Sequence, residues 1–296
     1  CIMPFTGTVL GGIQGLIFTP ANTVLNVSDM GHLLEVASLL VNSPNLTVEQ
    51  QQHHLDAMIN PVLAAVQELV QSPHMQIYAH DIGERLAQKL GLLASLTKGF
   101  HRRVDHLQEH CKRMLEASVS AVSALPEHAT LRSKAMVVVH RMVICMEHDL
   151  LPYLPYILPI LVTHMTPDIA DEAQRDTDNL VQLVNQLMIR YRHALGSLME
   201  TLLMKLLNRL FELMPSNSRE AHGQDLLPHT TAVQLCLQRL YYSVIQHVVA
   251  NGLSPVLLSD PVRPNLEQLL GTLVTALREV PDPMVKKNCV STLQLL

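Results

Sequence analysis

Apolar residues recur three and four positions apart along most of this chain, in blocks separated by proline, asparagine or short polar stretches. This is the period of an α-helix, in which residues three and four apart share one face. One block shows the pattern clearly, because its apolar residues form a single stripe: Val104, Leu107, Cys111, Met114, Leu115 and Val119. No segment alternates as a half-buried strand does, so the pattern predicts an all-α fold.

The blocks predict where the helices lie. We expect helices over residues 76–96, 102–124, 131–146, 169–190, 193–214, 230–250 and 264–280, a short proline-interrupted element over 150–165, and a last helix after Pro283. An earlier helix follows Thr47, because Thr47 and Gln50 have the spacing of a capping box. Pro61 lies inside that helix and predicts a kink or break near Asn60. A polar loop is expected over residues 215–225.

The predicted helices form pairs, and each pair has more apolar surface than it can bury alone. Stacking pair on pair buries this surface in one continuous core. The pairs start near Gln76, Leu131, Ile169, Thr230 and Pro283. These intervals bracket or slightly exceed the roughly 40–47 residues of HEAT and armadillo units. We therefore expect one continuous HEAT-like α-solenoid of antiparallel helix pairs over residues 1–296. Both ends are expected to be cut from a longer protein, with residues 1–28 poorly defined.

Composition and charge exclude several other classes of protein. A hydrophobic content of 48% excludes a disordered chain, and 3% aromatic residues argue against a β-sandwich. A formal net charge of -5 excludes a generally basic nucleic-acid binder. Residues 150–162 are the most apolar stretch, but they are too short to span a membrane and contain three prolines. The five cysteines are scattered, which is typical of reduced thiols in the cytosol or nucleus.

Basic residues gather in two places. The denser cluster contains Lys98, His101, Arg102, Arg103, Lys112 and Arg113, and a smaller one contains Lys286 and Lys287. Lysine and arginine on an exposed helix face can contact the phosphates of a nucleic acid. Acidic residues also lie within the denser cluster, so an ordinary solvated helix face is the alternative interpretation. The lysines and arginines of both clusters are our candidate RNA contacts.

The chain shows no motif for catalysis, for a metal or for a cofactor. His106 and His110 share a helix face, but the neighbouring Cys111 falls on the apolar stripe. We interpret the two histidines as exposed residues of a polar face rather than as metal ligands. No phosphate-binding glycine pattern and no nucleophile elbow occur. We therefore expect a binding protein and not an enzyme, since a helical solenoid offers extended surfaces for a macromolecule.

Three segments resemble the exportin-T family of the importin-β (karyopherin-β) superfamily of HEAT-repeat receptors. Residues 47–62 resemble a kinked helix that recurs in exportins, with the sequence TVEQQQHHLDAMINPV. Two others resemble exportin-T more specifically. These are residues 139–155, with VHRMVICM followed by LLPYLP, and residues 280–289, with VPDPMVKKNC.

The resemblance implies a nuclear export receptor for tRNA. Such a receptor binds tRNA cooperatively with the GTPase Ran in its GTP form, passes nucleoporins and releases its cargo in the cytoplasm. It shuttles between nucleus and cytoplasm, inserts into no membrane and binds no DNA. This chain would be a later portion of that receptor, and no contact residue is carried over from the family. Two alternatives are an importin-β-type receptor for protein cargo and a HEAT scaffold without RNA binding.

Overall fold

The structure, a computed structural model, describes residues 5–18, 25–165, 171–214 and 228–296. The chain divides into two compact units, residues 1–160 and residues 161–296, and each is described by itself. The described residues form helices and contain no strand, so the predicted all-α class is confirmed. The predicted loop at 215–225 lies outside the described residues. A single continuous solenoid over 1–296 stays a prediction.

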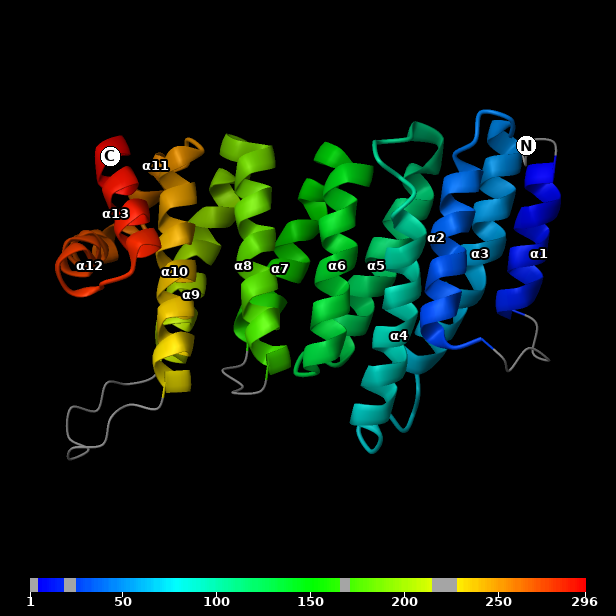
Figure 1. Cartoon of the computed structure of the whole chain (residues 1–296), viewed down its shortest axis with the longest axis horizontal. Coiled ribbons are helices and arrows are strands. Elements are labelled where there is room, and N and C mark those ends of the chain that lie inside the picture. The colour runs from blue at the N-terminus through cyan, green and yellow to red at the C-terminus, as the bar shows by residue number, and fades with distance from the viewer. Residues whose placement is uncertain (1–4, 19–24, 166–170, 215–227) are drawn as a thin grey trace. The chain divides into compact units, whose positions relative to one another are not determined.

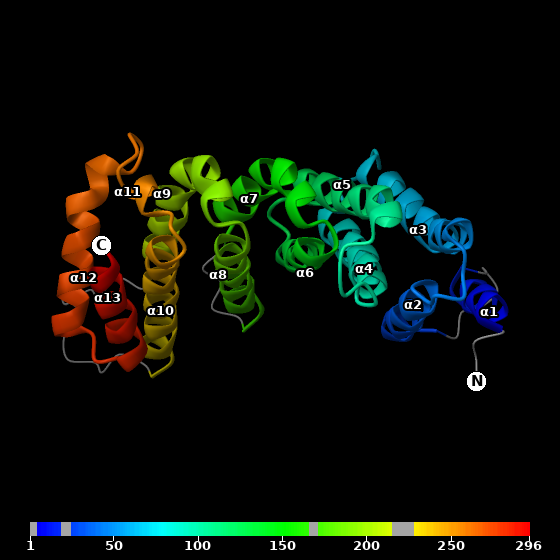
Figure 2. The ribbon, with the colours of Figure 1, turned by 90° about the horizontal axis from the view of Figure 1, so that it is seen from above.

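Unit 1 consists of helices in two rows. Its helices are α1 (Thr6–Phe18), α2 (Val27–Val41), α3 (Val48–Val70), α4 (Ala79–Thr97), α5 (Gln108–Ala124) and α6 (Ala129–Cys145). A 3-10 turn, η2 (Asp105–Leu107), precedes α5, and another, η3 (Glu147–Tyr153), follows α6. Helices α2, α4 and α6 pack side by side in one row, and α3 and α5 pack in the other (Figures 1 and 2). Helix α7 (Leu154–Thr163) begins at the end of this unit.

The core of unit 1 lies between these two rows. Each helix turns a leucine- and methionine-rich stripe inward, and the members of that stripe are almost completely buried: Leu34, Leu55, Met58, Leu86, Leu90, Leu93, Met114, Leu115, Val138 and Met142. Removing such surface from water contributes roughly 25 cal/mol per Å² and is the main stabilising contribution to this packing. The rows therefore satisfy the expectation that each helix pair depends on its neighbours.

Unit 2 repeats the same kind of packing. It contains α8 (Asp171–Tyr191), α9 (Gly196–Leu213), α10 (Pro228–Ala250), the short α11 (Ser254–Leu257), α12 (Leu266–Glu279) and α13 (Pro283–Leu295). A 3-10 turn, η4 (Arg192–Leu195), lies between α8 and α9, and η5 (Arg263–Asn265) leads into α12. Helix α10 packs against α8, α9 and α13, and α12 packs against α13.

Three details differ from the sequence-based expectations. Helix α1 falls within residues 1–28, where no helix was expected, and α2 was also not predicted. The predicted pair starts coincide with α4, α6, α8, α10 and α13. Of these, α4, α6, α10 and α13 each pack on the helix that precedes them, as second members of pairs. Helix α4 packs mainly on α2 and α6, whereas α5 packs along α6, so the predicted pairing is shifted by one helix. The sequence period marks each helix but not which neighbour it pairs with.

The predicted capping box at the start of α3 is confirmed, whereas a break at Pro61 is not. The Thr47 amide donates to Gln50 Oε1 at 2.9 Å, and the Gln50 amide donates to Thr47 Oγ1 at 3.3 Å. Helix α3 continues through Pro61. Pro61 is exposed, so water can take the place of the missing backbone donor on that side. In the described part of the chain, every helix is too short or too polar to cross a membrane.

Candidate nucleic-acid interface

The loop that joins α4 to η2, residues 98–104, carries most of the denser basic cluster. Lys98, His101 and Arg102 are exposed on it, and Arg103 is half-buried. Lys98 Nζ lies 2.8 Å from Glu35 Oε2 on α2, and both side chains remain substantially exposed. Arg102 makes no ion pair among the described residues. Within the part of the chain that the structure describes, the loop therefore presents one partly neutralised cation, Lys98, and one unpaired cation, Arg102, to solvent.

The same loop is held closely against α2. The Gly99 amide donates to Ser38 Oγ at 3.0 Å, and Asn42 Nδ2 donates to the Gly99 carbonyl at 2.9 Å. A Cβ at position 99 would lie 2.3 Å from Ser38 Oγ and 2.6 Å from the Leu39 amide nitrogen, so only glycine allows this approach. Phe100 is buried beside it. The backbone under Lys98 and Arg102 is thus well defined.

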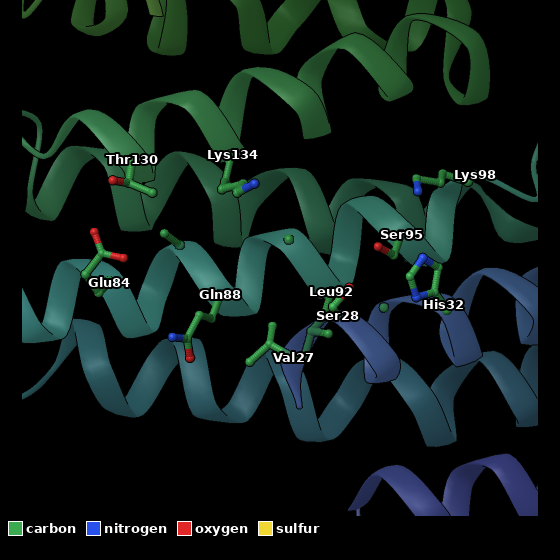
Figure 3. A pocket seen from close by; sticks show the side chains of 13 residues that line it. Val27, Ser28, His32, Glu84, Gln88, Leu92, Ser95, Lys98, Thr130 and Lys134 are labelled. Carbon is green, nitrogen blue, oxygen red and sulfur yellow. The ribbon is translucent and has the colours of Figure 1, made fainter. Parts of the chain in front are cut away.

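A groove of about 400 Å³ runs beside this loop between α2, α4 and α6 (Figure 3). Lys98 and His32 lie near one end of the groove, Lys134 reaches in from α6, and Glu84 lies toward the other end (Figure 3). Glu84 Oε1 is 3.6 Å from His128 Nε2, whereas Lys134 makes no ion pair in the part of the chain that the structure describes. The groove therefore holds a cation paired with Glu35 at the end that meets the loop, and a second cation, Lys134, that has no ion pair among the described residues.

Lys134 and His32 were missed by the sequence analysis. Lys134 lies in a helix that reads as apolar on nearly all sides, and His32 lies in the unpredicted α2. The only signal available was that Lys134 lies in the polar first turns of this helix, beside Arg132 and Ser133. Only the packing of α2, α4 and α6 brings these residues near Lys98.

Two of the candidate arginines have structural partners instead of free guanidinium groups. Arg103 Nε lies 2.7 Å from Asp105 Oδ1, and its Nη1 lies 2.5 Å from Asp149 Oδ2 and 3.0 Å from the Met146 carbonyl. These carboxylates raise the pKa of Arg103 through hydrogen bonding. The side chain therefore joins η2, which precedes α5, to the end of α6 and to η3.

Arg113 links the other row of unit 1. Its Nη1 lies 2.9 Å from Asp56 Oδ1 on α3, and its Nη2 donates to Asn60 Oδ1. Lys112, beside it on α5, is half-buried and makes no ion pair among the described residues. Both residues lie in the row of α3 and α5, so the structure separates them from the groove. Lys286 and Lys287 lie on α13 in unit 2 and form a separate basic pair.

His110 does not lie on an exposed polar face as expected. It is only 6% exposed, because α5 turns it toward α3. Its Nε2 is 3.3 Å from Asp56 Oδ1, but neither ring nitrogen has a hydrogen bond of good geometry. Within the described residues, no three His, Cys, Asp or Glu side chains are grouped so that they could hold a metal ion. The packing of α3 on α5 therefore accounts for the burial of His110.

Burial of His110 predicts a loss of stability in mild acid. Desolvation lowers the pKa of His110, and the nearby Asp56 opposes this shift only in part. A histidine with a lowered folded-state pKa contributes stability above its unfolded pKa of about 6.5, and that contribution falls as the pH drops toward the folded value. Hydrogen exchange of α3 and α5 amides at pH 7.5 and 5.5 should show faster opening at the lower pH.

The control for this prediction is His110→Gln, which cannot gain a proton in this range. This variant should lose part of the acid sensitivity of α5, whereas His54 and His140, whose pKa values burial also lowers, retain theirs. An unchanged acid response in the His110→Gln variant would contradict the assignment.

The comparisons with known proteins agree on one family. The sequence model of a family described as Exportin-T matches residues 24–296. A protein named Exportin-T from Danio rerio is 25% identical over 305 residues, and one from Homo sapiens is 25% identical over 308 residues; each match covers 99% of this chain and 30% of that protein. Exportin-T from Arabidopsis thaliana is 22% identical over 304 residues, with 98% and 30% covered. The chain thus spans about 30% of the length of these relatives.

Proposed function

Because the chain belongs to the exportin-T family, we propose that it is part of a nuclear export receptor for tRNA. In this proposal the receptor binds tRNA together with Ran in its GTP form, shuttles through the nuclear pore by contact with nucleoporins, and releases tRNA in the cytoplasm. It carries out no covalent chemistry. The observation that carries the proposal is the family match over nearly the whole chain, from residue 24 to 296.

The geometry of unit 1 supports an RNA contact at one particular place. Lys98 and Lys134 line the groove between α2, α4 and α6, and Arg102 is exposed on the loop that begins at Lys98. In the described part of the chain, Arg102 and Lys134 have no ion pair. Lysine and arginine at such a surface neutralise phosphates without reading base identity. We propose that these three residues contact the tRNA backbone. A net charge of -5 is compatible with this, because phosphate contacts need a local basic surface and not a basic chain.

The other candidate basic residues are not among these three proposed contacts. Arg103 and Arg113 are held by carboxylates and act mainly between helices. Lys112, Lys286 and Lys287 are candidate phosphate contacts at other places on the chain. The receptor for protein cargo and the scaffold without RNA binding are the alternatives, and the following experiment separates them.

Binding of tRNA to the full-length protein should depend strongly on salt and on Ran. The logarithm of affinity should fall linearly with the logarithm of salt concentration, with a slope of about -0.7 to -0.9 for each phosphate neutralised. The triple variant K98A/R102A/K134A should reduce the magnitude of this slope by about 2 to 3. GTP-loaded Ran should raise tRNA affinity, and tRNA should raise Ran affinity by the same factor. Fluorescence anisotropy with labelled tRNA measures both effects.

The matched control is Lys89→Ala, since Lys89 lies on α4 but does not line the groove. Its salt slope should equal that of the wild type. Ran coupling seen only with a protein cargo would favour the first alternative, and binding without any Ran coupling would favour the scaffold. Affinity for tRNA that is insensitive to salt would refute the proposed phosphate contacts.

A further inference from the structure

Arg141 on α6 lies beneath the 98–104 loop and binds its backbone. Its Nη2 donates to the carbonyl oxygens of Thr97, Lys98 and Phe100 at 2.9, 3.1 and 3.2 Å. These carbonyls close the carboxyl end of α4 and begin the loop. A guanidinium is favoured there, because the end of a helix carries negative partial charge on its carbonyl groups.

Arg141 and α2 hold the loop from opposite sides. Ser38 and Asn42 bind Gly99 from α2, and Arg141 binds the residues on either side of Gly99 from α6. Lys98 and Arg102 project from this doubly held backbone. Arg141 itself is only half exposed, and the hydrogen bonds of its Nη2 go to the protein backbone. The side chain is therefore placed to orient other cations rather than to meet a ligand.

We propose that Arg141 is a positioning residue for RNA binding, which fixes the loop so that Lys98 and Arg102 face the same stretch of phosphate backbone. This inference rests on the proposed function and adds a residue that touches no RNA. A cation on a mobile loop loses conformational freedom when it binds a phosphate, whereas a cation on a fixed loop has lost it already. Loss of Arg141 should therefore weaken binding through Lys98 and Arg102, and through no other contact.

A double-mutant cycle in the full-length protein with GTP-loaded Ran tests this inference. Arg141→Gln should lower tRNA affinity about three- to ten-fold at moderate salt, and should reduce the magnitude of the salt slope by about 1 to 2. K98A/R102A should reduce it by about 2. Adding Arg141→Gln to K98A/R102A should change the affinity by less than about two-fold and leave the salt slope unchanged, because the effects of interacting residues are not additive.

Arg132→Gln is the matched control. Arg132 lies on the same helix, is fully buried, and its Nη1 donates to the Pro126 carbonyl at 2.8 Å, so it also binds a backbone carbonyl but at the other end of α6. Arg132→Gln should lower the stability of the protein and leave the salt slope of tRNA binding unchanged. Asn42→Ala is a second probe, which removes a hydrogen bond to Gly99 from α2 and leaves α6 intact. Like Arg141→Gln, Asn42→Ala should reduce the magnitude of the salt slope. It keeps the inference testable if the Arg141→Gln protein does not fold.

Two failures can be told apart. If the wild-type protein binds no tRNA, the proposed function and this inference are both wrong. If the wild type binds tRNA but Arg141→Gln lowers affinity as much in the K98A/R102A background as alone, only the inference is wrong. The same conclusion follows if Arg132→Gln and Arg141→Gln reduce the salt slope equally.

Discussion

Replacing Gly99 by alanine should destabilise the packing of α2 against α4 by about 3 kcal/mol, since overpacking a closely fitted site typically costs about 1–3 kcal/mol and sometimes more. The added Cβ would lie 2.3 Å from Ser38 Oγ and 2.6 Å from the Leu39 amide nitrogen. The serine hydroxyl can rotate away, but the amide belongs to the backbone of α2, so the helix or the loop must move. Hydrogen exchange of peptides from α2 and α4 in the full-length protein measures the loss.

Gly91→Ala on α4, the helix that precedes the loop, is the control, and its effect on stability should have the opposite sign. The nearest atom to a Cβ at position 91 is Lys134 Cδ at 4.0 Å, which is an ordinary contact. Alanine is favoured over glycine in a helix interior by about 0.8–1.0 kcal/mol, so protection of α4 should rise slightly. Equal protection of the α2 and α4 amides in the Gly99→Ala variant and the wild type would show that the loop does not approach α2 this closely.

Replacing Asp282 by alanine should destabilise the start of α13 by about 2 kcal/mol, the upper range for loss of a helix cap. The Asp282 carboxylate is buried and accepts hydrogen bonds from the Met284 and Val285 amides at 2.9 and 3.1 Å. It also receives the Arg239 guanidinium from α10, with Nη2 at 2.5 Å from Oδ2. Alanine would leave all these donors without their acceptor. Faster exchange of amides in α13 and at the facing turn of α10 is the expected readout.

Asp282→Asn separates the cap from the ion pair, because asparagine caps helices as well as aspartate does. This variant should keep most of the protection of α13 and lose the pH dependence. Hydrogen bonds from Arg239 and from the backbone lower the pKa of Asp282, although burial opposes them. Its contribution to stability is therefore present above the unfolded pKa of about 3.9 and is lost as the pH falls through the lower folded value. An acid response that survives in Asp282→Asn would contradict this account.

Most helix positions were predictable, because helical period and capping are local properties. Residues 76–96 were predicted for α4, which spans Ala79–Thr97, and residues 193–214 for α9, which spans Gly196–Leu213. Helix α2 was missed although a signal existed. Asn26 and Asp29 form a capping box of the Asn-x-x-Asp kind, less familiar than the Thr-x-x-Gln of α3.

The candidate site was predictable only as a list of basic residues. Lys98 meets Glu35 across 63 residues of sequence, and Arg113 meets Asp56 across 57. No local pattern reveals partners at such a separation. The burial of His110 and the close contact of Gly99 with α2 were hidden for the same reason.

The amino-acid sequence by itself determined that this chain is helical, where most of its helices lie, and which family it resembles, since each of these is written in short segments. The tertiary structure alone decided which helices pair and, among the described residues, which cations are neutralised and which have no ion pair. These outcomes depend on contacts between residues far apart in the chain, and such contacts exist only once the apolar stripes of neighbouring helices have been buried against one another.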